Sequence, residues 1–354
     1  MAFSVKGKEG GIRMKQQLSS KRLIEAVEKE RFSGTIIVKK DGQTLFEHAA
    51  GYADKASQRL NFLDTKFGIA SGCKLFTAIA VCQLVESGSL SFHSRLNECL
   101  KKDFPTFDQS ITIHHLLTHS AGIPDYFDED EMEDFEELWK QTPMYSMKNA
   151  ADFLPLFQEK SMKDKPGNRF HYNNAGYILL GLIIEQQTGL SFSDYVEKHI
   201  FQPANMLDSG YFSLDQLPGN TAFGYIHNDD WNWRTNIYSI PIKGGADGGA
   251  FTTAPDMMKL WEALLNHQLL SKVLTDLLLT PHIKVKDGVE YGYGVWINRE
   301  GNHPWKYQVM GYDPGVSFHS AHYPQLNITM AIPSNHSSGP FKIMKIIEED
   351  LLSI

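Results

Sequence analysis

Residues 68–77 read GIASGCKLFT, and this stretch decides how the rest of the chain is interpreted. The residues that follow, Leu75 to Val85, are almost all apolar, which predicts a helix buried in the core. Lys74 stands at the start of that helix. Because an ammonium inside a core must be paired, neutralised or used in chemistry, Lys74 requires an explanation.

Ser71 lies three residues before Lys74, so on a helix the two side chains share one face. An amine that loses its solvation among apolar residues gives up its charge more readily, and a neutral amine can take the proton from a serine hydroxyl. A helix N-terminus also favours a developing oxyanion. Ser-x-x-Lys arises by chance about once in a chain of this length. Here it occurs only once, between a strand-rich region and a buried helix.

Composition limits the class of protein. The 354 residues are 42% hydrophobic and 21% charged, as in ordinary soluble globular proteins, and the net charge of -8 argues against a nucleic-acid binder. The expected partners are therefore small molecules or proteins. Three cysteines, Cys73, Cys82 and Cys99, show neither metal spacing nor an even-numbered disulfide framework, which favours a reducing compartment.

The ends and the apolar runs of the chain bear on its location. Residues 1–20 lack the apolar middle of a secretory signal, and no apolar run approaches the roughly 18 residues of a membrane span. We therefore predict a cytoplasmic protein with no membrane span. An extracytoplasmic location stays open if a signal has been removed, and the oligomeric state is left open.

The hydrophobic periodicity changes along the chain. Ser19 and Ser20 precede an amphipathic helical pattern, and β-rich runs then flank the turn signal Lys40-Asp41-Gly42. From Ser71 to about Gln216 the pattern is mostly helical. The clearest helices are 75–86, 113–119, 176–187, 254–266 and 341–352, and the clearest late strands are 291–297, 306–311, 315–323 and 326–334.

Strands at both ends with helices between them predict an α+β fold. Its antiparallel sheet is built from the N- and C-terminal segments and flanked by helices, and a large, mostly helical domain is inserted. The predicted boundaries are 19–70 and 240–354 for the sheet domain and 71–239 for the insert. Ser71 then falls at the junction, where we expect the active site.

Tyr172-Asn173-Asn174 precedes the apolar helix and forms a second candidate site element. A tyrosine hydroxyl near a lysine ammonium can have a lowered pKa and relay protons, and an asparagine amide can bond both the lysine and a substrate carbonyl. The alternative is a core tyrosine and an asparagine N-cap.

Taken together, Ser71-x-x-Lys74 and Tyr172-x-Asn174 resemble the serine β-lactamase and penicillin-binding protein superfamily, in particular its class C β-lactamase-like branch with esterases and D-amino-acid peptidases. The similarity covers roughly 34–334. It includes ITIHHLLTHSAGIPDY (111–126), GGADGGAFTTAPDM (244–257) and YGYGVWI (291–297). The resemblance implies a β-lactamase/transpeptidase-like fold in which Ser71 is acylated, Lys74 is the neighbouring base, and Tyr172 and Asn174 belong to the Tyr-x-Asn element.

The third family element departs from the pattern. The family places Lys-Thr-Gly or His-x-Gly shortly before a Pro-Gly, and counting back from Pro314-Gly315 gives Val309-Met310-Gly311. Gly311 keeps the close backbone approach, and the amides of Ser71 and Tyr312 would form the oxyanion hole. The cation is missing. Lys306 lies an odd number of residues from Val309 and so points to the opposite face. Weak recognition of a substrate carboxylate follows, and with it poor turnover of β-lactams or D-Ala-D-Ala.

Four further features have competing interpretations. His114, His115 and His119 include an i, i+4 metal-ligand spacing, but a structural segment is favoured over a metal site. Cys73 is interpreted as a small buried residue rather than a nucleophile. The acidic run 128–138 is interpreted as a solvated helix face. Trp231, Trp233, Tyr225 and Tyr238 either line the substrate pocket or pack over the sheet.

The sequence thus predicts a serine hydrolase that works through an acyl-enzyme on Ser71, without metal or cofactor. Candidate substrates are small esters, amides, D-amino-acid peptides and, as slow acylating ligands, β-lactams. The rival hypothesis is a non-catalytic module that keeps the fold for binding or scaffolding. A lipase-type esterase is disfavoured because the chain has no Gly-x-Ser-x-Gly.

Overall fold

The computed structural model of the chain describes residues 18–351. Residues 1–17, where a secretory signal was predicted to be absent, and Leu352, the last residue of the predicted C-terminal helix, lie outside the described residues. Among the helices that are described, none combines the length and the hydropathy needed to cross a membrane. The compartment stays a prediction.

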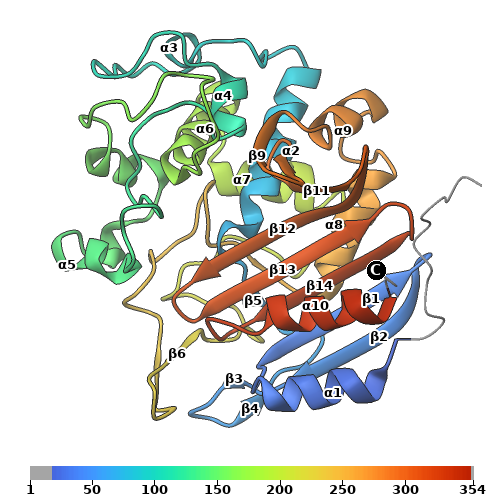
Figure 1. Ribbon diagram of the computed structural model, residues 1–354. Coiled ribbons are helices and arrows are strands. Elements are labelled where there is room, and N and C mark those ends of the chain that lie inside the picture. Colours follow the sequence, from blue (N-terminus) through green and yellow to red (C-terminus); the bar gives the residue numbers. More distant parts are fainter. Residues whose placement is uncertain (1–17, 352–354) are drawn as a thin grey trace, which may run out of the picture.

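The largest element of the fold is an eight-stranded antiparallel sheet drawn from both ends of the chain (Figure 1). Its spatial order is β2-β1-β14-β13-β12-β11-β10-β9. The strands are β1 (Gly34–Lys40), β2 (Gln43–Ala50), β9 (Ile283–Lys286), β10 (Val289–Tyr291), β11 (Trp296–Glu300), β12 (His303–Asp313), β13 (Val316–Tyr323) and β14 (Ile328–Ser334). N-terminal β1 pairs with C-terminal β14, so that Gly34 faces Ser334. The predicted α+β class with a two-segment sheet is confirmed.

The β1–β2 hairpin forms where the turn signal predicts it. Lys40 pairs with Gln43, and the two residues between them, Asp41 and Gly42, have φ angles of 50° and 77°. Positive φ at both positions is the geometry of a type I′ turn, for which Asp-Gly is a preferred pair.

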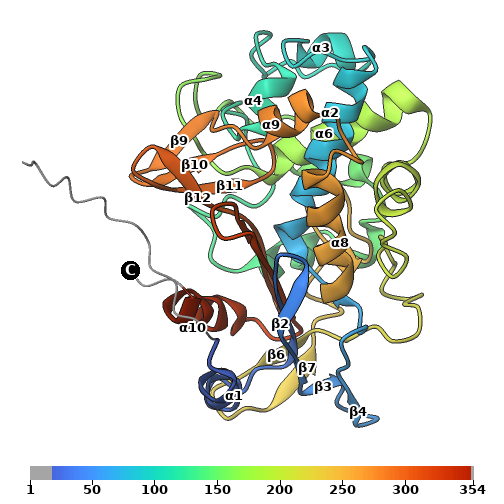
Figure 2. The ribbon, with the colours of Figure 1, turned by 90° about the vertical axis from the view of Figure 1, so that its right-hand side faces the viewer.

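Helices cover both faces of the sheet (Figure 2). On one face α1 (Ser20–Lys29) and α10 (Pro340–Leu351) share a core with Ile36 of β1. Its neighbour Ile37 faces the other side and joins the larger core, which contains α2 (Lys74–Glu86) and α8 (Ala254–Leu265). The strand period of two thus divides one strand between two cores.

The segment between the sheet halves holds short helices and loops around two long apolar helices, α2 and α6 (Asn174–Thr188). The remaining helices are η1 (Ala70–Cys73), α3 (Leu96–Cys99), α4 (Ile113–Leu117), η2 (Phe135–Glu137), α5 (Leu138–Gln141), η3 (Met144–Ser146), η4 (Ala150–Leu156), α7 (Phe192–Val196), η5 (Glu197–Phe201) and α9 (Lys272–Leu278). The small strands are β3 (Tyr52–Asp54), β4 (Arg59–Leu60), β5 (Phe67–Gly68), β6 (Tyr225–His227), β7 (Trp233–Thr235) and β8 (Phe251–Thr252).

Two predicted elements differ from the structure. The helix expected over 113–119 ends at Leu117, because His119 turns into the left-handed region with φ 54°. The strand expected over 291–297 is divided between β10 and β11. Gly294 has φ 71° in the intervening turn, and a Cβ there would lie 2.8 Å from the Lys74 carbonyl oxygen. The turn therefore packs directly against the first turn of α2.

The predicted division at 70/71 and 239/240 stays a prediction. The hairpin of β6 and β7 belongs to the predicted insert by sequence, yet it lies against the end of the sheet. The Tyr225 amide donates a 2.9 Å hydrogen bond to the carbonyl of Asn335, just beyond β14.

Candidate active site

Ser71 sits in the tight 3-10 turn η1, directly before α2. Ala70 before it has φ 44°, an unfavourable backbone conformation for a residue with a Cβ. The turn is fixed from outside: the Ile69 amide donates to Ala250 O at 2.9 Å, and the Gly249 amide donates to Ala70 O at 3.2 Å. Backbone strain held in place by neighbouring segments is common at functional sites.

Lys74 contacts Ser71 and Asn174, as the sequence predicts, and also Asp247, which the sequence did not predict. Its Nζ donates to Ser71 Oγ at 2.9 Å, to Asn174 Oδ1 at 2.8 Å and to the Asp247 carbonyl at 2.6 Å. The residue is only 2% exposed. All three partners are neutral oxygens, so the amine is held in place without an ion pair in these contacts.

Tyr172 completes the group around the serine. Its hydroxyl interacts with Ser71, and Lys74 Nζ lies 4.9 Å from the centre of its ring. Burial raises the pKa of Tyr172 well above its ordinary value, and the bond to Ser71 opposes this only in part. The expected lowering of this pKa is therefore wrong, because burial, reinforced by Glu129, raises it. Tyr172 is a neutral hydroxyl that can pass a proton without ionising.

The sequence left two roles open for the adjacent asparagines, an N-cap and a contact with Lys74, and the structure gives one role to each. Asn173 is the N-cap of α6, with its Oδ1 accepting the Gly176 amide at 2.7 Å. Asn174 instead turns its Oδ1 to Lys74. Its backbone amide donates to Asp125 Oδ2 at 2.6 Å, and this buried carboxylate also accepts the Ala175 amide at 3.0 Å. Asp125 thus positions Asn174 at the start of α6.

Strand β12 closes the other side of the serine. A Cβ on Gly311 would lie 2.1 Å from Ile69 O and 2.8 Å from the Ser71 amide nitrogen, so only glycine fits. Tyr312 follows, with its side chain on the opposite face, where its hydroxyl hydrogen-bonds His319. The Tyr312 backbone is thereby next to Ser71, and its part in an oxyanion hole stays a prediction.

Lys306 does not replace the missing family cation. It lies on the far face of the sheet, where its Nζ pairs with Glu348 of α10 at 2.8 Å. Val309 is 2% exposed and belongs to the larger core. The alternation argument from the sequence agrees with this arrangement.

Three acidic side chains at the site were not recognised from the sequence. Asp247 accepts a hydrogen bond from the Tyr126 hydroxyl, and burial raises its pKa. Asp313 and Glu129 line the same cavity. Asp247 and Tyr126 lie within phrases that carry the family resemblance, which was the available signal. Asp313 had none beyond its place after Gly311.

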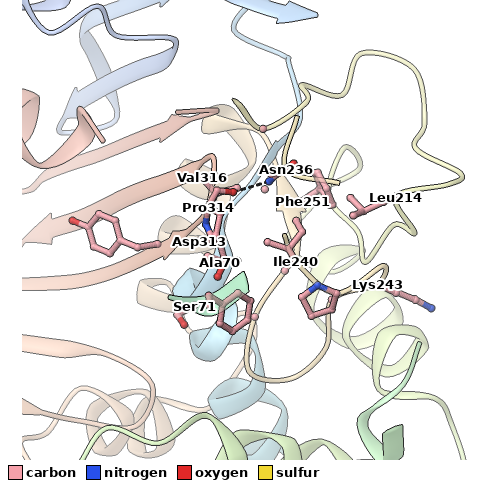
Figure 3. A pocket seen from close by; sticks show the side chains of 18 of the residues that line it. Ala70, Ser71, Leu214, Asn236, Ile240, Lys243, Phe251, Asp313, Pro314 and Val316 are labelled. Carbon is pink, nitrogen blue, oxygen red and sulfur yellow. Dashed lines mark hydrogen bonds between the residues drawn. The ribbon is translucent and has the colours of Figure 1, made fainter. Parts of the chain in front are cut away.

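The cavity beside Ser71 is shown in Figure 3. Ser71, Ala70 and Asp313 lie on one side of it, and Leu214, Ile240 and Phe251 lie across from them. Further apolar side chains line it, namely Phe127, Phe135, Phe153, Phe212, Leu217 and Ile242. A carbonyl compound with an apolar substituent fits such walls.

The aromatic residues of the 225–238 loop do not line this cavity. Tyr225 and Trp233 contact each other edge to face at 5.1 Å, Trp231 lies under Arg31, and Tyr238 is exposed. The pocket-lining interpretation is wrong for these four residues. Their neighbours Asn236, Ile237 and Ile240 line the cavity instead.

The acidic run 128–138 is only partly a solvated helix. Its helical portion begins at Phe135. Asp128 is buried and pairs with Lys163 at 2.9 Å and with His171 at 3.3 Å. The interpretation as a solvated face failed at Asp128 because its partners are distant in sequence.

The histidines and Cys73 have structural surroundings. His114 Nδ1 contacts the Tyr293 hydroxyl at 2.9 Å, His115 Nδ1 accepts the Thr112 amide at 3.2 Å, and His119 Nδ1 accepts the Asn173 amide at 3.0 Å. Within residues 18–351, one group of three side chains has metal-ligand geometry, Asp128, Asp130 and His171, and it includes none of these three. Burial raises the pKa of Cys73 to about 12, so the thiol is not an activated nucleophile.

Comparison with known proteins shows which family has this fold. The Beta-lactamase family model matches residues 20–350, and the chain belongs to that family. The finer assignment to the class C branch stays a prediction.

The similar proteins include two penicillin-binding proteins. Penicillin-binding protein 4* of Bacillus subtilis is 29% identical over 303 residues, which cover 81% of this chain and 64% of that protein. The chain thus spans just under two thirds of that relative. The crystal structure of a penicillin-binding protein from Bacillus halodurans has 53% identity and a TM-score of 0.89, with 92% of this chain and 99% of that one covered. The D-amino acid amidase of Ochrobactrum anthropi shares the fold, with 21% identity, a TM-score of 0.75 and coverage of 93% and 98%.

Proposed function

We propose that the protein is a serine hydrolase that acts through an acyl-enzyme on Ser71. Membership of the Beta-lactamase family supports a hydrolase of this fold. The observation that carries the proposal is the 2.9 Å contact between Lys74 Nζ and Ser71 Oγ. This distance is within reach for proton transfer from a nucleophile to its base.

The reaction begins with attack of Ser71 Oγ on the substrate carbonyl carbon, while the hydroxyl proton moves to the amine of Lys74. The carbonyl oxygen becomes an oxyanion, which the amides of Ser71 and Tyr312 stabilise. The bond to the leaving group then breaks, and that group takes a proton from Lys74 by way of the neutral Tyr172 hydroxyl. Water attacks the ester on Ser71 and releases a carboxylic acid.

The expected substrates are small esters, amides and D-amino-acid peptides with an apolar substituent. The phenylalanine-derived ligands named with the D-amino acid amidase structures suit the aromatic and aliphatic walls of this cavity. We expect β-lactams to acylate slowly, because Val309 offers no charge to their carboxylate.

The test is intact mass after incubation with a fluorophosphonate and, separately, with a penicillin. A single adduct on the wild type that is lost in Ser71→Ala supports the proposal. Ser87→Ala is the matched control, since it removes an exposed hydroxyl at the far end of α2 and should keep the adduct. If the wild type forms no adduct with either reagent, the non-catalytic module becomes the better description.

A further inference from the structure

The pocket side of β12 carries an unusual sequence of side chains. Val309, Gly311 and Asp313 lie two residues apart and so share one face of the strand. Gly311 lies against the Ser71 backbone. At about 3.3 Å per residue, Asp313 stands about 7 Å further along that face. It follows Tyr312 directly, so its carboxylate lies beside the place where an acyl group would bind.

The Asp313 carboxylate has no counter-ion of its own. Within the described part of the chain it takes no hydrogen bond and no ion pair, although it is half-buried in the cavity lining. A carboxylate in such a place costs free energy unless something satisfies it. By contrast, Asp247 beside it takes a hydrogen bond from the Tyr126 hydroxyl.

The charges around this cavity are predominantly negative. Its lining includes the carboxylates of Glu129, Asp247 and Asp313 and a single lysine, Lys243. The Lys243 Nζ lies 3.4 Å from Ser193 Oγ, and Figure 3 shows it pointing away from Asp313. Lys74 is committed to Ser71, Asn174 and Asp247. An incoming cation therefore finds an acceptor here, whereas an incoming carboxylate meets repulsion.

We infer that Asp313 binds the free ammonium group of the substrate, so that the enzyme prefers amides or esters of amino acids with an unblocked α-amine. This inference rests on the proposed function, since it places the ammonium relative to an acyl group on Ser71. It also accounts for the absence of the family cation at Val309, since a site that binds an ammonium does not need one. The site selects for positive charge on the acyl side of the scissile bond rather than for a carboxylate.

The pH profile of binding follows from the same group. Burial, reinforced by Asp247, raises the pKa of Asp313 to about 7. The charged groups facing it are Asp247, Glu129 and Lys74. Affinity for an ammonium should rise with pH as Asp313 ionises, then fall as the substrate α-amine, with a pKa near 8, loses its proton.

The experiment compares D-phenylalanine methyl ester with its N-acetyl derivative, which has the same side chain and no ammonium. The ratio of their kcat/KM values is measured for the wild type, Asp313→Asn and the control Asp103→Asn, an exposed carboxylate. We expect Asp313→Asn to lower the ratio at least tenfold, mainly through KM, while Asp103→Asn leaves it unchanged. A ratio that Asp313→Asn does not lower would overturn the inference.

Binding to Ser71→Ala provides a readout that needs no turnover. D-phenylalanine amide should raise the Tm of Ser71→Ala, and adding Asp313→Asn should abolish that rise. Fluorophosphonate labelling of the Asp313→Asn single variant separates the two proposals. Labelling with an unchanged substrate ratio would overturn the ammonium site alone, whereas a wild type that no reagent labels would overturn the hydrolase.

Discussion

Two lysines on the two sides of the same sheet are equally buried but have different partners. Lys74 and Lys306 are each 2% exposed. Lys306 pairs at 2.8 Å with the buried carboxylate of Glu348. Lys74 instead contacts a hydroxyl, an amide oxygen and a carbonyl oxygen.

The difference lies in what each amine can do with a proton. Burial lowers the pKa of Lys306 and Glu348 opposes this only in part, and the ion pair links β12 to α10. Lys74 has no carboxylate among its hydrogen-bond partners, and its neighbour Ser71 offers a hydroxyl proton that an amine can accept. Burial alone therefore does not distinguish the proposed base Lys74 from Lys306; the partners of each amine do.

The largest effect should come from Lys74→Met. Loss of the base is expected to slow fluorophosphonate labelling of Ser71 by about 1,000-fold, within the usual range for general bases. Since burial of the Lys74 amine costs free energy that its three hydrogen bonds offset, the Tm should stay the same or rise. Stopped-flow or timed mass spectrometry measures the rate, and calorimetry measures the Tm. A labelling rate within tenfold of wild type would contradict the role of Lys74.

Lys306→Met should lower the stability and leave the labelling rate of Ser71 unchanged, the opposite of Lys74→Met. It leaves Glu348 buried without its main partner, which is expected to cost about 3 kcal/mol of unfolding free energy. Labelling of Ser71 should keep its wild-type rate below the unfolding transition. Denaturant unfolding of Lys306→Met and of Lys306→Met/Glu348→Gln tests the pair, since the second change should restore part of the loss. A variant as stable as wild type would show that the ion pair is not structural.

The Lys306–Glu348 pair should also make stability depend on pH in the acidic range. Burial would raise the pKa of Glu348, but Lys306 and hydrogen bonds from Lys306, Lys345 and Tyr323 outweigh it and lower the pKa. A carboxyl with a lowered folded pKa stabilises above its unfolded value, and that stability is lost as pH falls through the folded value. The Tm of the wild type should therefore fall more between pH 5 and pH 3 than that of Lys306→Met/Glu348→Gln. Parallel curves would contradict this.

Much of this comparison could be predicted from the sequence. The Ser71-x-x-Lys74 spacing placed both groups on one turn, and strand alternation placed Lys306 on the far face. The Tyr172 pKa could not be predicted, because it depends on how completely distant segments enclose the hydroxyl. The solvated interpretation of Asp128 failed for the same reason: Lys163 and His171, its partners, come from a later loop.

The sheet was predictable because periodicity and turn residues are local properties. The division of 291–297 was not, since Gly294 turns there to pack against Lys74, which lies 220 positions earlier by residue number. The sequence gives no sign of a role for Asp313, because it does not show which residues line the cavity. Only the cavity showed a carboxylate two positions beyond Gly311, on the same face of the strand.

The smallest expected effect concerns Asp313, whose carboxyl has neither the ion pair of Glu348 nor a hydrogen bond among the described residues. Its pKa is raised to about 7, so the folded state holds a proton that the unfolded chain has released above pH 4. Stability from this group is full at low pH and is lost as pH rises through about 7. Asp313→Asn cannot lose it, so its Tm should exceed that of the wild type by roughly 2 °C at pH 8, by less at pH 5, and match it near pH 4. Asp103→Asn, an exposed change of the same chemistry, should show no pH-dependent difference. An equal offset at pH 8 and near pH 4 would mean that folding does not raise the pKa of Asp313.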